Sequence, residues 1–192
     1  MSRVLVPLAP GFEEIEAVTV VDLLRRAGIE VHTASLDGPL VTGSHGITVS
    51  ADMALDAAVA DDYDMIVLPG GMPGAEHLRN DARVISLLRR CAAAGRFTAA
   101  ICAAPAVLAH AGLLEERAAT SFPGFLTARS APGIRLRDEP VVVDGKVVTS
   151  RGAGTALEFG LVLVGLLAGP DVRRQVGERL QLVRGWGIGD GG

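Results

Sequence analysis

Short apolar runs that favour strands alternate with longer segments of helical period along this chain, and this alternation constrains the fold more than any other feature. Five runs have the length and composition of strands: "RVLVPLA" (3–9), "EVHTAS" (30–35), "DMIVLPG" (64–70), "FTAAIC" (97–102) and "KVVTS" (146–150). Strands separated by helices form parallel sheets, and strands that are apolar throughout are buried on both faces. The sequence therefore predicts an α/β fold with a mostly parallel sheet covered by helices on both faces.

Other segments complete this layout. The first helix is expected to begin near Glu13, with acidic residues in its first turn, and to stop at Gly28. Asp144 and Gly145 lie between two β-branched runs and predict a hairpin, and a smaller β-excursion is expected around "LVTGSHGITV" (40–49). The apolar stretch 159–169 is interpreted as a buried helix, because it falls well short of the roughly 20 residues that span a membrane.

Length and composition fit one globular domain. The chain has 192 residues, of which 49% are hydrophobic, and a chain of this size can bury a substantial core. We expect a single domain over residues 1–184, followed by a Gly-rich tail over 185–192. The two cysteines, Cys91 and Cys102, fit neither a disulfide framework nor a C-x-x-C motif.

Charge and targeting signals narrow the class of partner. The net charge is −4 and aromatic residues make up 4% of the chain, which gives no basic stripe for phosphates and no aromatic platform for bases. Nucleic acid is therefore not expected as the main ligand. The N-terminal residues lack a charged leader followed by a long apolar region, so no signal peptide is expected. We predict a cytoplasmic protein whose partner is a small molecule or a second copy of the chain.

Cys102 occupies the junction between a strand and a helix. It follows the run that ends at Ile101 and precedes a helix expected to start between Ala103 and Pro105, where a proline fits the first turn. Such a turn aims the side chain out of the sheet at the positive end of a helix, which exposes a nucleophile and lowers the pKa of a thiol. The alternative is a small core residue, since free cysteine is often buried.

Glu16 is the second candidate for chemistry. It lies on the same side of the first helix as Val20, Leu23 and Ala27. A carboxylate at the head of an apolar row is desolvated and can hold a proton near neutral pH. The alternative is a first-turn acid that stabilises the helix dipole, which suits Glu13 and Glu14 better than Glu16.

The remaining motifs give weaker signals. Gly70 and Gly71 in "LPGGMPG" allow the backbone to approach a ligand and to offer an N–H to an oxyanion, but neither this segment nor "SRGAGTALEF" matches a nucleotide-binding signature. The four histidines are scattered, without a cluster that includes cysteine or carboxylate, so zinc and iron are not expected. Cys91 shares a helical row with leucines and is assigned to the core.

Four segments together resemble bacterial members of the DJ-1/PfpI (ThiJ) superfamily: "APGFEEIEAV", "VLPGGMPGAEHL", "AAICAAPAVL" and "VVTSRGAGTALEFGL". The resemblance covers about residues 3 to 180. It implies a flavodoxin-like sandwich, usually homodimeric, with the reactive cysteine of the family at Cys102 and its protonated glutamate at Glu16. It also places the family's backbone donor at Gly71, with the N–H of Ala103 beside it.

Three positions depart from the pattern of the superfamily. Ala103 stands where the branch known as peptidases has histidine, and Phe122 stands where animal members have a histidine near the cysteine. His45 occupies a position where many relatives carry an anion-binding arginine. A Cys102–Glu16 pair without a histidine is therefore the site that we expect.

The resemblance implies a cofactor-free glyoxalase or deglycase that acts on methylglyoxal and its early adducts, with Cys102 as nucleophile and Glu16 as proton shuttle. The first alternative is a redox sensor or oxidation-linked chaperone in which Cys102 is oxidised to sulfinate. The second is another cysteine hydrolase, such as an amidase or peptidase. The fold by itself does not rank these functions.

Overall fold

The computed structural model describes residues 2–182, and its centre is a seven-stranded sheet with the order β10-β11-β7-β6-β1-β2-β5. All neighbouring pairs are parallel except β10 and β11. The strands are β1 (Arg3–Leu8), β2 (Glu30–Ser35), β5 (Met53–Ala54), β6 (Met65–Leu68), β7 (Phe97–Ile101), β10 (Val141–Asp144) and β11 (Val147–Ser150). The five predicted runs and the hairpin at Gly145 are confirmed.

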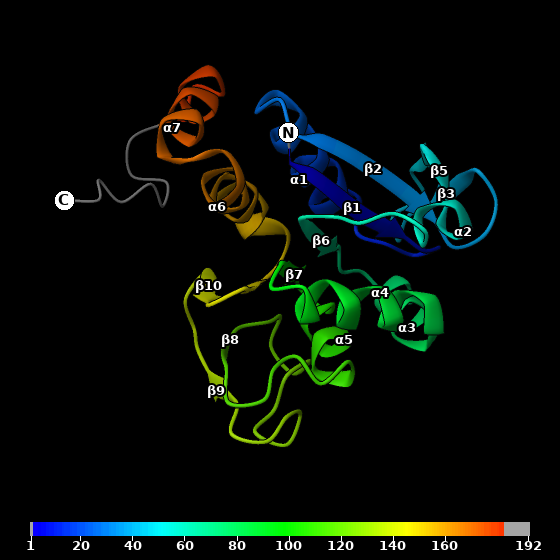
Figure 1. The fold of residues 1–192 in the computed structure, drawn as a ribbon, viewed down its shortest axis with the longest axis vertical. Coiled ribbons are helices and arrows are strands. Elements are labelled where there is room, and N and C mark those ends of the chain that lie inside the picture. Colours follow the sequence, from blue (N-terminus) through cyan, green and yellow to red (C-terminus); the bar gives the residue numbers. More distant parts are fainter. Residues whose placement is uncertain (1, 183–192) are drawn as a thin grey trace.

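Two small sheets lie outside this frame. One pairs β3 (Leu40–Thr42) with β4 (Thr48–Ser50) in antiparallel fashion, and the other pairs β8 (Ala118–Ala119) with β9 (Arg135–Leu136). The first is the β-excursion predicted around residues 40–49. In Figure 1 it projects from the end of the molecule that carries β2 and β5.

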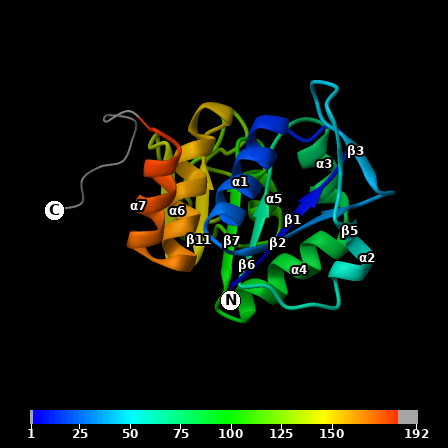
Figure 2. The ribbon, with the colours of Figure 1, turned by 90° about the horizontal axis from the view of Figure 1, so that it is seen from above.

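Helices cover both faces of the central sheet, as Figures 1 and 2 show. One face carries α1 (Glu14–Arg26), α6 (Ala156–Ala168) and α7 (Pro170–Arg179), and a short 3-10 helix (Ala153–Thr155) precedes α6. The other face carries α2 (Leu55–Ala58), α3 (Gly74–Asn80), α4 (Ala82–Ala93) and α5 (Pro105–His110). The predicted flavodoxin-like, three-layer α/β architecture is confirmed.

Strand side chains alternate between the two cores. Val4 and Val6 of β1 pack with α1 and α6, whereas Leu5 packs with α4 and α5 on the other face. Every one of these three side chains is at most 1% exposed, which explains why the strand is apolar throughout. Cys91 is buried on the face of α4 and α5, where the sequence placed it.

Two expectations concern the ends and the apolar segments of the chain. The segment 159–169 falls in the buried helix α6, as predicted. Across the described residues, no helix combines the length and apolarity that crossing a membrane requires. The predicted Gly-rich tail, 185–192, lies outside the described residues, and the boundary of the domain at residue 184 stays a prediction.

Candidate active site

Cys102 lies in a sharp turn between β7 and α5. Its φ is 64°, in the left-handed region that a residue with a Cβ seldom adopts. The backbone is held there from both sides, because the N–H of Cys102 donates to the Ser150 carbonyl at 3.0 Å and its carbonyl accepts from the Phe122 N–H at 2.9 Å. Pro105 begins α5 as predicted. This strand-turn-helix arrangement presents the half-buried thiol at the carboxyl edge of the sheet.

Glu16 reaches the same edge from α1 and is fully buried, at 0% exposure. Its Oε2 accepts a hydrogen bond of 2.8 Å from the Gly70 N–H. Its Oε1 has no hydrogen-bond partner among the described residues, although the neighbouring Cys102 thiol acts on its pKa. Val20 and Leu23 on the same side of α1 are each 1% exposed, so the predicted apolar row is confirmed.

Gly70 and Gly71 are glycines because the site leaves no space for a side chain. A Cβ on Gly70 would lie 2.6 Å from the Cys102 Cβ and 2.8 Å from the Glu16 Oε2. Gly71 has a φ of +87°, and a Cβ there would lie 2.3 Å from the Glu13 nitrogen. The Glu13 N–H in turn donates to the Gly70 carbonyl at 2.9 Å. The glycine turn therefore holds α1 and Cys102 within contact of each other.

Burial changes the protonation of this pair. It raises the pKa of Glu16 to about 7, although the Gly70 N–H and the Cys102 thiol oppose the rise. Burial also raises the pKa of the Cys102 thiol, to about 12, and the Glu16 carboxylate adds to the rise. The predicted lowering of the thiol pKa is therefore wrong. Protonation of Glu16 removes the repulsion, so the pair favours states with one negative charge between them.

Two backbone N–H groups act on the pKa of the sulfur. The N–H groups of Gly71 and Ala103 both act to lower the pKa of Cys102, which is the effect of donors directed at a developing anion. Ala103 is 2% exposed, so its N–H is shielded from water. An oxyanion that forms on an atom bonded to Sγ would meet these two donors. The structure thus brings together Cys102, Glu16, Gly70, Gly71 and Ala103, while their part in catalysis stays a prediction.

An aromatic residue, Phe122, borders the thiol. A Cβ on Gly152 would lie 3.5 Å from the Phe122 ring and 3.9 Å from the Cys102 Sγ, so Phe122 and the sulfur flank the same glycine. Phe122 is 49% exposed and packs edge-on against Phe125, with ring centroids 6.1 Å apart. The wall of the site on this side is therefore apolar and open to solvent.

The four histidines lie elsewhere. His32 contacts Glu30 at 2.9 Å, His77 contacts the Pro10 carbonyl at 3.1 Å, and His110 is exposed at the end of α5. None of them hydrogen-bonds to Cys102 within the part of the chain that the structure describes.

His45 corrects the expectation that no histidine lies with carboxylates. Its N–H donates to the Glu14 Oε1 at 2.8 Å, and its Nδ1 lies 3.1 Å from the Glu14 Oε2. Burial tends to raise the pKa of Glu14, but hydrogen bonds from backbone groups, those of His45 and Ile47 included, outweigh it and lower this pKa to about 2. Sequence reasoning treated Glu14 as an ordinary first-turn acid, because nothing local separates it from Glu13.

This corner is also the place in the described chain where a metal ion could be held. Ligand atoms of Glu13, Glu14 and His45 lie within 4.8 Å of one another. Both oxygens of Glu14 already accept hydrogen bonds from the turn between β3 and β4. The carboxylate therefore fastens this turn to the start of α1.

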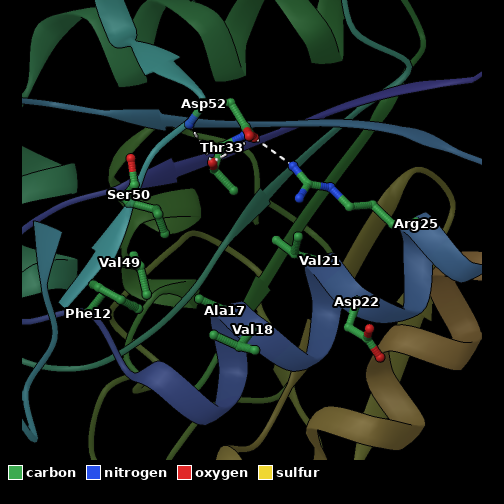
Figure 3. Close-up of a pocket in the computed structure, with 11 residues that line it drawn as sticks. Phe12, Ala17, Val18, Val21, Asp22, Arg25, Thr33, Val49, Ser50 and Asp52 are labelled. Carbon is green, nitrogen blue, oxygen red and sulfur yellow. Dashed lines mark hydrogen bonds and ion pairs between the residues drawn. The ribbon is translucent and has the colours of Figure 1, made fainter. Parts of the chain in front are cut away.

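Two cavities flank the site without including the sulfur. The first, the α1 cavity, has a volume of about 250 Å³ and lies between α1 and β4 (Figure 3). Val18, Val21 and Val49 supply apolar walls, and an ion pair of 2.6 Å between Arg25 and Asp52 closes one end. Neither Cys102 nor Glu16 lines it.

The second, the side cavity, has a volume of about 190 Å³. Ala103, which follows Cys102, and Met72, which follows Gly71, both line it. Phe125 adds an apolar wall, and Glu76 and Arg79 of α3 are its charged members. Sequence reasoning missed this cavity, because its walls come from three segments that are distant along the chain.

Comparisons with known proteins identify relatives of this chain. A sequence model described as "DJ-1/PfpI family" matches residues 2–166. Protein dj-1beta of Drosophila melanogaster is 40% identical over 177 residues, covering 92% of this chain and 95% of that protein. Deglycase PfpI of Pyrococcus furiosus is 34% identical over 152 residues, covering 79% of this chain and 91% of that protein.

A plant relative is much longer than this chain. Protein DJ-1 homolog A of Arabidopsis thaliana is 40% identical over 181 residues, which cover 93% of this chain and 46% of that protein. The chain therefore spans about half the length of this relative, and 39% of the related homolog B is covered.

Solved structures superpose closely on the described fold. The crystal structure of Drosophila melanogaster DJ-1beta has a TM-score of 0.90 and 39% sequence identity, with 95% of this chain and 100% of that chain covered. The structure titled "Toxoplasma gondii DJ-1, oxidized" has a TM-score of 0.89 and 39% identity over the same shares of the two chains.

Proposed function

Because the chain belongs to the DJ-1/PfpI family, we propose that it is a cysteine-dependent enzyme that converts methylglyoxal and its early adducts into lactate without a cofactor. The observation that carries this proposal is the fully buried Glu16, with a pKa near 7, beside Cys102 and two backbone donors. A carboxyl group with such a pKa both takes up and releases protons at neutral pH. The deglycases of Pyrococcus among the relatives support a small carbonyl adduct as substrate.

The first step is addition of sulfur to the aldehyde. The Cys102 thiol gives its proton to Glu16, and the thiolate adds to the aldehyde carbon of methylglyoxal. A C–S bond forms, the C=O π bond opens, and the oxyanion accepts hydrogen bonds from the N–H groups of Gly71 and Ala103. Protonation of this oxyanion by Glu16 gives a hemithioacetal and restores the Glu16 carboxylate.

The second step moves one proton between neighbouring carbons. The Glu16 carboxylate removes the proton from the carbon bonded to sulfur, which gives an enediolate. The hydroxyl proton on that carbon moves to the former ketone oxygen, and Glu16 returns its own proton to the adjacent carbon. One carbon is oxidised as its neighbour is reduced, so the product is the lactoyl thioester and no external oxidant takes part. Water then hydrolyses the thioester, which releases lactate and the free Cys102 thiol.

Lactate formation from methylglyoxal tests this mechanism. D-lactate and L-lactate are measured without added thiol for wild-type protein and for Cys102→Ala, Glu16→Gln and Cys91→Ala. We expect Cys102→Ala to abolish lactate and Glu16→Gln to lower kcat by about a hundredfold or more, the usual contribution of a positioned acid-base group. Cys91→Ala is the matched control, because Cys91 is buried in the core away from the site. Lactate production that survives in Cys102→Ala would exclude the mechanism.

Oxidation of Cys102 supports a second function, that of a redox sensor. The observation that favours it is the Glu16 Oε1, which is buried and has no hydrogen-bond partner in the described chain. A protonated Glu16 would donate from this oxygen to a sulfinate on Cys102. The Toxoplasma relative, whose structure is titled as oxidised, is consistent with oxidation in this fold. Carbonyl detoxification remains the first proposal, because sensing needs neither the second donor nor a mobile proton.

We also propose that the chain forms a homodimer through the face that contains α1 and the β3–β4 hairpin. Ile15 and Val18 of α1 are 57% and 52% exposed, and Leu40 and Ile47 of the hairpin region are 64% and 57% exposed. The α1 cavity lies between these two elements (Figure 3). Exposed apolar side chains grouped around a cavity favour burial against another protein surface.

A further inference from the structure

A basic groove lies next to the side cavity. It has a volume of about 780 Å³, and Arg79, Arg89, Arg90 and His110 are among its lining residues, which include no carboxylate. The chain as a whole has a net charge of −4. The groove, which is lined by basic side chains and no carboxylate, therefore differs in charge from the chain as a whole. The groove runs along α3 and α4 and ends at α5.

Backbone contacts fix two of the arginines in place. The Arg89 Nε donates to the Ala111 carbonyl at 3.1 Å, and the Arg90 NH2 donates to the Asp61 carbonyl at 2.6 Å. One carboxylate approaches, that of Asp62, at 3.9 Å from the Arg90 Nε. A guanidinium held through one nitrogen keeps its other donors in a defined orientation. The positive charge of the groove is thus largely preorganised.

Arg79 connects this groove to the candidate active site. It lines both the groove and the side cavity, and it makes no hydrogen bond or ion pair with the residues that the structure describes. The side cavity also includes Ala103, whose N–H acts on the Cys102 sulfur. Cys102 itself does not line the side cavity, so Ala103 and Met72, the neighbours of Cys102 and Gly71 along the chain, are what relate the cavity to the site.

The side cavity has both apolar and charged walls. Met72, Val107 and Phe125 are apolar members of its lining. Glu76, three residues before Arg79, lies on the same side of α3. The Glu76 carboxylate, one helical turn from Arg79, opposes the binding of an anion, while Arg79 and the other basic side chains of the groove favour it.

We propose that the side cavity binds the departing thiol or amine of a carbonyl adduct and that Arg79 recognises an anionic group on it, a carboxylate or a phosphate. The Cys102 sulfur bonds to the carbinol carbon, the C–S or C–N bond of the adduct breaks, and the thiol or amine leaves with the proton that Glu16 took from Cys102. Arg79 then determines specificity, and the reacting carbonyl stays at Cys102. This inference rests on the proposed function and narrows its substrates to adducts of anionic molecules. Arg89 and His110 extend the same recognition to longer anions.

Hemithioacetals of methylglyoxal with thiols of different charge test the specificity. The thiols are 2-mercaptoethanol, 3-mercaptopropionate and 2-mercaptoethyl phosphate, each used at the same concentration of free methylglyoxal. For wild-type protein we expect kcat/KM to be about tenfold higher with an anionic thiol than with 2-mercaptoethanol, as one charge-assisted contact provides. The anionic thiol with the higher kcat/KM relative to 2-mercaptoethanol shows whether a carboxylate or a phosphate is preferred. Equal values for all three thiols would overturn the inference.

Variants assign the preference to Arg79. We expect Arg79→Glu to remove the preference, so that kcat/KM with the anionic thiols no longer exceeds kcat/KM with 2-mercaptoethanol. Arg179→Glu carries the same change of charge on an exposed residue at the end of α7, far from α3 (Figure 2), and should keep the preference. A preference that survives in Arg79→Glu, or is lost equally in Arg179→Glu, would contradict the assignment.

Labelling of Cys102 provides a readout that does not depend on catalysis. Rates of modification by an anionic sulfonatoethyl and a cationic trimethylammonium-ethyl methanethiosulfonate are measured by intact mass in a Cys91→Ala background. We expect Arg79→Glu to lower the ratio of anionic to cationic rates by about tenfold, and Arg179→Glu to leave it unchanged. If wild-type protein makes no lactate but this ratio moves, the proposed function fails and the anion site stands. If lactate forms and the ratio does not move, the anion site fails.

Discussion

At the scale of single residues, the chemistry of the site depends on how two buried groups share a proton. A cysteine at a strand-to-helix turn is expected to have a low pKa, yet burial and the Glu16 carboxylate raise the pKa of Cys102 to about 12. Glu16 itself, at a pKa of about 7, is half protonated near neutral pH. The thiolate therefore becomes accessible when Glu16 holds the proton, and Glu16 controls the reactivity of Cys102.

This dependence leads to a prediction for oxidation. Mild peroxide should add two oxygen atoms to Cys102 in wild-type protein and then stop, because protonated Glu16 donates a hydrogen bond to the sulfinate. Glu16→Leu keeps a side chain of similar size without the donor, so it should give a mixture that proceeds to the sulfonate. Intact mass and peptide mapping follow both proteins. A stable sulfinate in Glu16→Leu, or equal oxidation of buried Cys91, would argue against this role of Glu16.

At the scale of elements, the start of α1 joins three parts of the fold. The Glu13 N–H binds the glycine turn, Glu14 binds the turn between β3 and β4, and Glu16 points at Cys102. The contact with Glu14 is close, because a Cβ on Gly43 would lie 2.3 Å from the Glu14 Cδ. A single helical turn therefore fixes both the β3–β4 hairpin and the carboxyl group of the site.

The pKa of Glu14 gives this contact a characteristic pH dependence. Its folded-state value, about 2, lies below its ordinary 4.5, so the carboxylate stabilises the fold above about pH 4.5 and loses this effect as the pH falls toward 2. Glu14→Gln should lower the free energy of unfolding by about 1–3 kcal/mol at pH 7 and by less at pH 3.

Urea unfolding of both proteins at the two pH values measures this difference. Glu115→Gln, at an exposed position, is the control and should change stability little at either pH. A loss in Glu14→Gln that is the same at pH 3 and pH 7 would exclude the ionised carboxylate as its cause.

At the scale of the whole molecule, the two proposed surfaces lie on opposite sides of the central sheet. The apolar face of α1 and the β3–β4 hairpin is on one side, and the basic groove of α3, α4 and α5 is on the other (Figures 1 and 2). The candidate active site lies at the carboxyl edge of the strands between them. Dimer formation through α1 would therefore leave the groove open to substrate.

The oligomeric state tests the proposed dimer interface, which contains α1 and the β3–β4 hairpin. We expect light scattering after size exclusion to give a mass about twice the 19.8 kDa of the chain, and Val18→Arg to give the monomer mass, because a charge would be buried in the interface. Leu166→Arg, at a partly exposed position of α6, should remain dimeric. A wild-type protein that is monomeric at micromolar concentration would refute the interface.

Sequence patterns predicted the structural features that are determined by residues close together along the chain. The five strand runs, the first helix, the hairpin at Gly145 and the turn at Cys102 follow from local period and composition. The contact of Glu14 with His45 could not be predicted, because it joins residues that are far apart and resembles no motif. The raised pKa of Cys102 was also missed, since it arises from burial and from Glu16, whereas the turn alone suggests the opposite sign.

Ala103 has two roles, one for its backbone N–H and one for its side chain. Its backbone N–H acts on the pKa of the Cys102 sulfur, and its side chain borders the side cavity. The donor is present whatever side chain follows Cys102, proline excepted. Evolution can therefore exchange the side chain at position 103 to reshape what the cavity accepts while the donor to the oxyanion persists. Substrate preference can therefore change by substitution at position 103 while each intermediate enzyme keeps this backbone donor.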